Sequence, residues 1–181
     1  MARKWIDRKT IGKSKLMAEN IGLKLFNERG LPITIIEPVT VYGGNDVGNF
    51  EKLKALVNKG IVAKLGDGTN KKTIIYYEDL IDMTIANDKK AIGKIIICGT
   101  ESISLNSILE VLKNSSSKKV ITLSFGNRIT KLMIKGLNTI GLGVTKKIGR
   151  QITVLASNNE YDLESSKKYI KKFTGFKDYY N

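Results

Sequence analysis

Lys15 is the first side chain whose type and spacing suggest chemistry. It lies in the segment 11–19, where a helix is expected, so a residue four positions earlier shares its helix face. A proton-transferring side chain at that position would have its pKa lowered by the Lys15 ammonium. Position 11 is isoleucine, which cannot transfer a proton. The expected helix therefore presents a cation without a proton-transferring partner one turn before it.

Several classes of reaction are excluded by composition. The chain contains no histidine, which removes histidine triads, histidine general bases and the usual zinc sites. Its single cysteine, Cys98, ends an apolar run of three isoleucines, so no disulfide can form within the chain. A buried strand position is expected for it, and we expect no metal site.

The chain is strongly basic, with 31 Lys+Arg against 17 Asp+Glu and a formal net charge of +14 over 181 residues. Arginine, the usual residue for bidentate recognition of phosphates and bases, is scarce among them, so we expect no nucleic-acid partner. A positive field suits an anionic nucleotide substrate. The N-terminus has no apolar signal core, and no apolar run approaches the ~18 residues needed to span a bilayer. A cytoplasmic protein is therefore expected.

The segment 111–150 is the most basic part, with nine basic residues and no acid. Apolar residues recur at helical spacing over residues 128–147. Two interpretations fit a basic amphipathic helix. It can lie on an anionic membrane surface, or it can pack on the core with a solvated lysine face, which we favour.

The apolar pattern predicts alternating helices and strands. Met17, Ile21 and Leu25 recur at helical spacing and predict a helix over 13–29, followed by a strand over 33–36. A helix followed by an apolar strand is half of a parallel-sheet unit. Further helices are predicted over 50–58, 78–86, 105–113 (with Ser104 as N-cap), 128–147 and 163–172, and further strands over 73–77, 94–98 and 120–123. The expected fold class is α/β.

Four segments, in order, resemble motifs of the extended short-chain dehydrogenases/reductases, in the NAD-dependent epimerase/dehydratase family. Residues 11–19 resemble the active-site helix Tyr-Gly-x-Ser-Lys-Leu-x-Ala-Glu, with isoleucine in place of tyrosine. Residues 37–44 are similar to the loop Arg-Pro-x-Asn-Val-Tyr-Gly-Pro. Residues 66–80 are similar to Gly-Asp-Gly-x-Asn-x-Arg-Ser followed by Val-Tyr-Val-x-Asp-Leu. Residues 99–112 are similar to a glycine turn and the Ser/Thr-capped helix that follows it. Looser matches at 161–168 and 173–176 extend the resemblance over nearly the whole chain.

The resemblance implies the C-terminal part of a Rossmann-like parallel sheet plus a small α/β substrate-binding domain. The N-terminal dinucleotide-binding βαβ unit, with its Gly-x-x-Gly-x-x-Gly turn, would be absent. Residues of about 1–60 and 73–100 would be the remnant of the cofactor-domain sheet, with substrate-domain insertions. Residues of about 101–181 would be substrate-domain-like.

The resemblance also implies roles for individual residues. Lys15 would be catalytic and would bind NAD or NADP together with Pro38 and Val39. The nucleotide sugar would be bound by Thr40, Asn70 and Lys72, with Lys72 at the position of a basic residue that meets the substrate diphosphate. Glu37 replaces an arginine of the family motif, and Thr40 replaces an asparagine.

Three functional hypotheses follow. The first is a truncated or split nucleotide-sugar epimerase/dehydratase, inactive alone, whose N-terminal half is lost or encoded separately. The second is a non-catalytic protein that binds a nucleotide sugar or a partner. The third is a basic protein that binds a membrane surface or nucleic acid. Under the first, an apolar edge around 33–36 is exposed, so self-association is expected.

Overall fold

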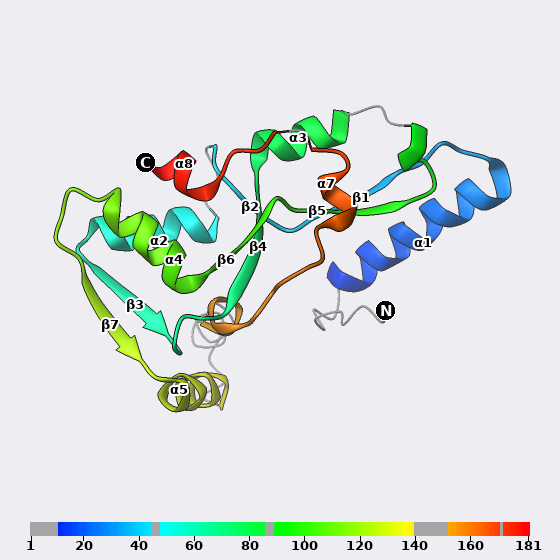
Figure 1. Cartoon of the computed structure of the whole chain (residues 1–181). Helices are drawn as coiled ribbons and strands as arrows, with labels where there is room; N and C mark the ends of the chain where they lie inside the picture. The colour runs from blue at the N-terminus through cyan, green and yellow to red at the C-terminus, as the bar shows by residue number, and fades with distance from the viewer. Residues whose placement is uncertain (1–10, 45–47, 86–88, 140–151, 171) are drawn as a thin grey trace.

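The computed structural model describes residues 11–44, 48–85, 89–139, 152–170 and 172–181 (Figure 1). Its helices are α1 (Ile11–Arg29), α2 (Asn49–Asn58), α3 (Tyr77–Ile85), α4 (Leu105–Asn114), α5 (Asn127–Thr139), α7 (Glu164–Lys167) and α8 (Phe176–Tyr180), with a 3-10 helix at Lys89–Ala91. Its strands are β1 (Ile35–Pro38), β2 (Thr40–Tyr42), β3 (Ile61–Leu65), β4 (Lys71–Tyr76), β5 (Ile95–Cys98), β6 (Glu101–Ser104) and β7 (Ile121–Phe125).

Three of the four strand pairings are parallel. β1 pairs with β5, β2 pairs with β4, and β3 pairs with β7. The antiparallel pairing joins β4 to β6, which makes β4 the central strand of the order β2-β4-β6. The α/β class predicted from the sequence is confirmed, and parallel strands separated by helices match part of a Rossmann-like fold.

Helix α1 packs along the β1–β5 pair and runs antiparallel to it. Gly22 lies beside Ile35, where an added Cβ would be 3.5 Å from the Ile35 side chain. One turn later, Phe26 packs on Gly93, just before β5, where an added Cβ would come within 2.4 Å of the Phe26 ring. The start of α1 therefore lies toward the carboxyl ends of β1 and β5 (Figure 1).

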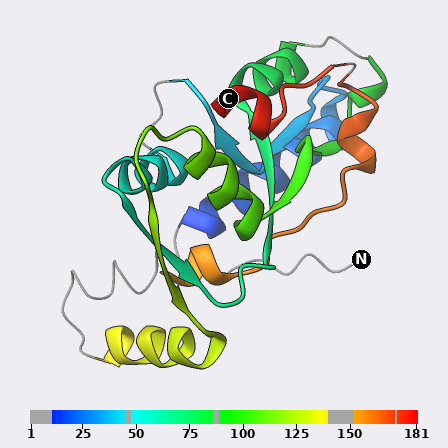
Figure 2. The same ribbon diagram turned by 60° about the vertical axis from the view of Figure 1, so that its left-hand side comes forward.

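Two apolar clusters form the core. The larger lies between α2, α4 and α8 and includes Tyr42, Ile74 and Val62. The smaller includes Ile75, Ile96 and Cys98. Cys98 is fully buried in strand β5, as predicted. Figure 2 shows α2 and α4 side by side, with the β3–β7 pair extending away from them toward α5.

Most predicted elements are present, with boundaries shifted by a few residues. The helix predicted over 163–172 is wrong in length: only Glu164–Lys167 is helical, and a separate helix, α8, follows it. Strands β2 and β6 were not predicted because they are short and carry polar residues, and β3 was not predicted because its pairing with β7 is remote in the sequence. Helix α5 ends at Thr139 in the described chain, and the rest of the segment predicted as helical, 140–147, lies outside the described residues.

Two of the three residues that predicted α1 lie on its exposed side. Met17 is 63% exposed and Ile21 is 55% exposed, whereas Leu25 is partly buried. The helical period is therefore correct, but this stripe is not the face that contacts the sheet. Within the described residues, no helix has the length and apolar character to cross a membrane.

The N-cap of α4 provides a test of the fold. Ser104 Oγ accepts a hydrogen bond of 3.1 Å from the Ser107 backbone N–H, as predicted from the sequence. The Ser104→Ala substitution is expected to lower the free energy of unfolding by about 1 kcal/mol, because one helix N–H loses its acceptor. Urea denaturation measures this change. Ser117→Ala, in the exposed loop after α4, is the matched control and should leave the midpoint unchanged.

Candidate functional site

Lys15, Pro38 and Val39 lie toward the same edge of the β1–β5 pair. Because α1 is antiparallel to β1, the first turns of α1 and the end of β1 lie at the same edge of the β1–β5 pair. Lys15 and Pro38 are exposed, and Val39 packs partly against the smaller core cluster. The carboxyl ends of parallel strands are where open α/β sheets bind ligands. The predicted cofactor residues therefore occupy the expected edge of the sheet.

Neither Tyr42 nor Tyr76 offers the acid/base group that position 11 lacks. Tyr42 is 1% exposed, and its hydroxyl donates a 2.5 Å hydrogen bond to the Thr174 carbonyl. Burial, followed by the charges of Glu101 and Asp79, raises the pKa of Tyr42 above its usual value. Tyr76 packs within the same aromatic cluster, with its ring centroid 5.7 Å from that of Tyr42. Tyr42 is thus held as a neutral, buried donor.

Lys72 and Asn70, predicted to bind the substrate, both hold the segment 152–159. The Lys72 Nζ donates to the carbonyls of Val154 and Ser157, and the side chain is only 6% exposed. The Asn70 Nδ2 donates to the Leu155 carbonyl at 2.7 Å and to the Ser157 carbonyl at 3.2 Å. Strand β4 and segment 152–159 are therefore joined by side chains of the predicted diphosphate-binding positions.

The backbone strengthens this attachment. Thr73 N donates to the Asn159 carbonyl and Asn159 N donates to the Lys71 carbonyl, both at 2.9 Å. A diphosphate would reach the Lys72 ammonium only by displacing the two carbonyls. The resemblance places a basic residue at this position but says nothing of its burial, which is why the contact was not foreseen. The substrate-binding role of Lys72 and Asn70 stays a prediction.

Thr40, the third predicted substrate residue, begins strand β2 and pairs with Ile74 of β4. It is half-buried, one residue after the edge that holds Pro38 and Val39. This position is compatible with a ligand that lies across the end of β1. Thr40 therefore lies next to Pro38 and Val39 in the chain and pairs with the strand that carries Lys72.

The fit of a dinucleotide cofactor is partial. Gly43 and Gly44 follow β2 with φ of +90° and +69°. An added Cβ on Gly43 would lie 2.4 Å from the Tyr76 ring, so this turn packs against protein and not around a ligand. Lys15 is exposed toward the carboxyl end of β1, but the described residues contain no glycine-rich cradle for a pyrophosphate at a helix N-terminus. The described residues also contain no group of three acidic, cysteine or histidine side chains suited to a metal ion.

Two acids bind backbone N–H groups of the C-terminal segment, which sequence reasoning treated only as a loose motif. Asp79 Oδ2 accepts from Thr174 N at 2.9 Å, and Glu101 Oε1 accepts from Phe176 N at 2.6 Å. Burial raises the pKa of Asp79, and the Thr174 hydrogen bond opposes this shift. These carboxylates accept hydrogen bonds from backbone N–H groups. They carry structure rather than acid/base chemistry.

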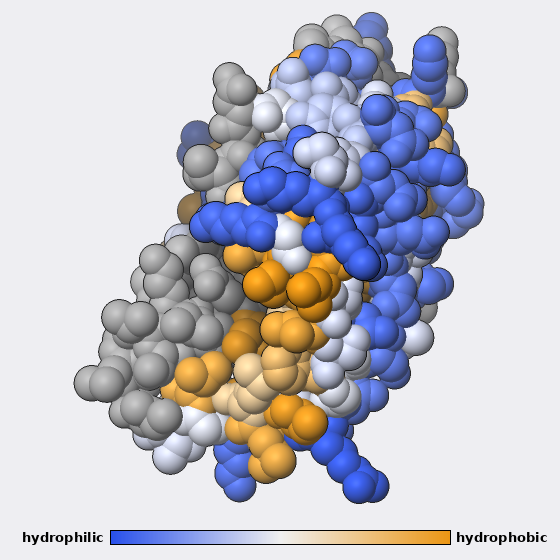
Figure 3. Space-filling model, turned by 90° about the vertical axis from the view of Figure 1, so that its left-hand side faces the viewer, coloured by the Kyte–Doolittle hydropathy of each residue, from blue (hydrophilic) through white to orange (hydrophobic). Residues whose placement is uncertain are grey.

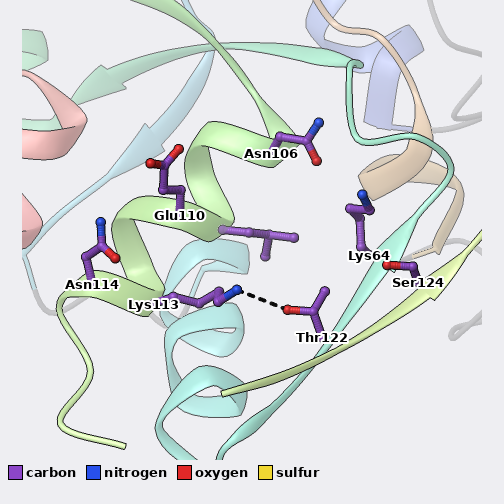
Figure 4. A pocket seen from close by; sticks show the side chains of 8 residues that line it. Lys64, Asn106, Glu110, Lys113, Asn114, Thr122 and Ser124 are labelled. Atoms are coloured by element: carbon purple, nitrogen blue, oxygen red, sulfur yellow. Dashed lines mark hydrogen bonds between the residues drawn. The ribbon is translucent and has the colours of Figure 1, made fainter. Parts of the chain in front are cut away.

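A polar pocket of about 370 Å³ lies between α4 and the β3–β7 pair. Figure 4 shows Lys64 and Lys113 facing it from opposite walls, with Glu110 on the α4 side and a 3.3 Å hydrogen bond from Lys113 Nζ to Thr122 Oγ1. None of the residues predicted from the sequence lines it. Nothing in the sequence indicated it, because one wall comes from β3 and the others from α4 and β7, which lie about forty residues or more further along the chain.

The contacts of Lys72 predict that removal of its ammonium group loosens the segment 152–159. In Lys72→Met, the carbonyls of Val154 and Ser157 lose their donor, so the free energy of unfolding should fall by about 1–3 kcal/mol. Hydrogen exchange should increase over residues 152–159. The matched control is Lys71→Met, which removes an exposed ion pair with Glu160 and should change stability little. Equal hydrogen-exchange protection of residues 152–159 in both variants would contradict the attachment of this segment by Lys72.

The same lysine predicts a pH dependence. Burial lowers the pKa of Lys72 from 10.5 to about 8 in the folded chain. Between these values the unfolded chain binds more protons, so the contribution of Lys72 to stability rises with pH. The stability difference between the wild-type chain and Lys72→Met should therefore grow from about pH 7 to pH 9.5. Denaturation of both proteins in parallel measures it, and a constant difference would argue against the shift.

No family model matches the chain. Among curated proteins, it is 35% identical over 75 residues to UDP-glucose 4-epimerase of Vibrio cholerae, covering 41% of this chain and 23% of that protein. It is 31% identical over 111 residues to UDP-glucuronate 4-epimerase of Thermodesulfobacterium geofontis (strain OPF15), covering 59% of this chain and 34% of that protein. The chain thus spans about a third or less of the length of these relatives.

Solved structures agree with this similarity. UDP-glucuronic acid 4-epimerase from Bacillus cereus, in complex with NAD, aligns with a TM-score of 0.55 and 28% identity, covering 64% of this chain and 40% of that one. An NAD-dependent NDP-hexosamine 5,6-dehydratase involved in tunicamycin biosynthesis aligns with a TM-score of 0.64 and 15% identity, covering 96% and 52%. The chain is therefore similar in sequence to UDP-sugar 4-epimerases, and its fold matches part of the Rossmann-like fold of NAD-dependent epimerases and dehydratases.

Proposed function

We propose that the chain is the substrate-side part of a nucleotide-sugar epimerase/dehydratase-like enzyme and is inactive on its own. One observation carries this proposal: α1 and the β1–β5 pair bring Lys15, Pro38 and Val39 to the carboxyl edge of parallel strands. This is the edge at which such sheets bind nucleotides. The similarity to UDP-sugar 4-epimerases supports the choice of a nucleotide sugar as substrate.

The strand pairing supports a proposed division of the chain into a cofactor-domain part and a substrate-side part. Residues of about 1–60 and 73–100 provide the remnant of the cofactor-domain sheet, since they contain β1, β2 and β5. Residues of about 101–181 form the substrate-side part. The antiparallel pairing of β6 with β4 supports this division, because β6 begins at residue 101 and reverses the direction of the sheet that contains β2 and β4.

The described chain alone lacks an acid/base group beside Lys15 and a cradle for the cofactor pyrophosphate. NAD or NADP, when bound, would supply hydride acceptance and return. Lys15 would hold the ribose and stabilise an ionised proton acceptor beside it. Ile11 cannot act as that acceptor, so acid/base assistance worth about 10²–10⁴-fold is missing. The pyrophosphate cradle is also missing from the described residues, so no catalytic step is assigned to this chain by itself.

A second polypeptide that carries the glycine-rich half would complete the site. Strand β1 pairs only with β5 among the described strands, which leaves one backbone edge available for another parallel strand. On the adjoining helix, Leu16, Met17 and Ile21 are 38%, 63% and 55% exposed. An apolar helix stripe beside an unpaired strand edge fits a strand-and-helix unit. A second copy of this chain is the competing occupant.

The competing hypothesis is a non-catalytic protein that binds nucleotide sugars. The pocket between α4 and β7 favours it, because Lys64 and Lys113 place two cations in a concave polar site. In that case a nucleotide sugar binds without NAD, and its affinity depends on these lysines rather than on Lys15.

Calorimetric titration separates the two hypotheses. The chain is titrated with NAD and with UDP-glucose, alone and together with a glycine-rich half taken from the UDP-glucuronate 4-epimerase relative. We expect NAD binding only with the added half, and epimerase or dehydratase turnover only when Ile11→Tyr is also present. Ile11→Phe is the matched control, since it adds the ring without the hydroxyl.

Three outcomes bear on the proposal. Turnover that is equal in Ile11→Phe and Ile11→Tyr would show that the restored hydroxyl is not the acid/base group. Saturable UDP-glucose binding without NAD, lost in Lys113→Met but kept in Lys15→Met, would favour the non-catalytic hypothesis. NAD binding by the chain alone would contradict the proposed dependence on a second half.

The α1 stripe predicts self-association of the isolated chain. Concentration-dependent dimers or larger species are expected by light scattering, because exposed apolar area is removed from water on contact. Met17→Ser combined with Ile21→Ser should shift the chain toward monomer. A monodisperse monomer at all concentrations before mutation would count against an open apolar face.

A further inference from the structure

The outer face of the β3–β7 pair is an apolar surface that none of the predicted site residues explains. Ile61 pairs with Ile121 and Ala63 pairs with Leu123, so these four side chains lie on one face of the two-stranded sheet. Ile61, Ile121 and Leu123 are 52%, 59% and 48% exposed. Their strand neighbour Val62 points the other way and is buried in the larger core cluster. This face is therefore exposed in the described structure, although its apolar side chains are typical of a sheet face that packs against a core.

Helix α5 continues the apolar face beyond the end of β7. Ile129 is 52% exposed and Leu132 is 69% exposed, one helical turn apart. The helix is attached through its first turn, where buried Thr130 Oγ1 donates to the Phe125 carbonyl at 2.9 Å and accepts from Gly66 N at 3.1 Å. Figure 3 shows one continuous apolar area on this side of the molecule. We call the six residues Ile61, Ala63, Ile121, Leu123, Ile129 and Leu132 the β7–α5 surface.

Basic side chains border the β7–α5 surface at both ends. Exposed lysines precede the two strands, and exposed basic residues lie on α5: Lys59, Lys118 and Lys119 at the first end, and Arg128, Lys131 and Lys135 at the second. Figure 3 shows hydrophilic side chains above and below the apolar area. Residues 111–150 of the sequence include no acid. The nearby Asp67 is already engaged by Thr69 and Asn127.

We propose that the β7–α5 surface docks on an anionic lipid bilayer. Exposed aliphatic side chains flanked by lysines meet the two requirements for stable interfacial binding, which are apolar insertion and attraction to acidic headgroups. A second copy docked through this same surface would bring the basic residues that border it close to those of its partner. A nucleic acid would contact the lysines but would leave the aliphatic residues exposed to water.

The docking surface is separate from the proposed catalytic edge. None of its six residues belongs to α1, β1 or β2, which carry Lys15, Pro38 and Thr40. The polar pocket opens on the opposite face of the β3–β7 pair, where Thr122 and Ser124 alternate with Ile121 and Leu123. Lipid binding therefore does not depend on the proposed function, and either proposal can fail alone.

Cosedimentation with vesicles tests the proposal on the full chain. Binding is expected to vesicles that contain phosphatidylglycerol, to be weak with phosphatidylcholine alone, and to fall as salt is added. Ile129→Ser combined with Leu132→Ser should lower the partition coefficient about tenfold or more, through lost insertion. Lys131→Gln combined with Lys135→Gln should lower it by about tenfold, through lost attraction.

Matched controls lie at the other end of the molecule. Leu31→Ser with Ile81→Ser removes exposed apolar residues outside both apolar surfaces, and Lys89→Gln with Lys94→Gln removes two exposed lysines near β5. Both controls should keep wild-type binding, and circular dichroism should show that all four variants are folded. The proposal is overturned by absence of binding to anionic vesicles, or by equal losses in the controls. Binding that needs the lysines but not Ile129 and Leu132, or a lipid-free dimer that these two residues hold together, would overturn it as well.

Discussion

The buried strand β4 is the constraint on which the rest of the structure depends. Its successive residues Ile74 and Ile75 are both fully buried and point into different apolar clusters. On its edges it pairs with β2 and β6, and its carbonyl at Ile74 accepts from both the backbone N–H and the hydroxyl of Thr100. At its start, Lys72 and Thr73 hold the segment 152–159. One strand thus links both cores to the last third of the chain.

This arrangement explains why several polar side chains form hydrogen bonds with the backbone and are not available to a ligand. Lys72, Asp79 and Glu101 each bond main-chain groups of the last thirty residues of the chain. A buried charge is tolerated only with such partners. Among the predicted site residues, Lys15 and Pro38 are the ones that remain exposed at the β1 edge.

The two uncovered apolar regions lie at opposite ends of the molecule and differ in kind. Beside α1, the strand β1 has an unpaired backbone edge, so a partner there gains hydrogen bonds as well as apolar contact. At the β7–α5 surface, the exposed part is the face of a sheet and one side of a helix, with lysines around it. That surface fits a flat apolar layer with negative headgroups better than it fits a strand.

Sequence reasoning worked where a single local signal decides the outcome. The Ser104 cap, the buried Cys98 and the helices at 49–58 and 105–114 follow from capping chemistry or from apolar periods that match burial. It failed where distant contacts decide. Strand β3 exists because β7 pairs with it some sixty residues later, and α8 is held by Glu101 of β6 and Glu51 of α2.

The sequence by itself determined the α/β class, the absence of histidine chemistry and the similarity to sugar-nucleotide epimerases, because composition and motif order are local properties of the chain. It also placed isoleucine at position 11, which no fold can turn into an acid. Only the tertiary structure decided that Lys15 and Pro38 share an edge, and that Lys72 is held by carbonyls of residues 154 and 157. Burial and proximity come from packing between remote segments, and no motif encodes them.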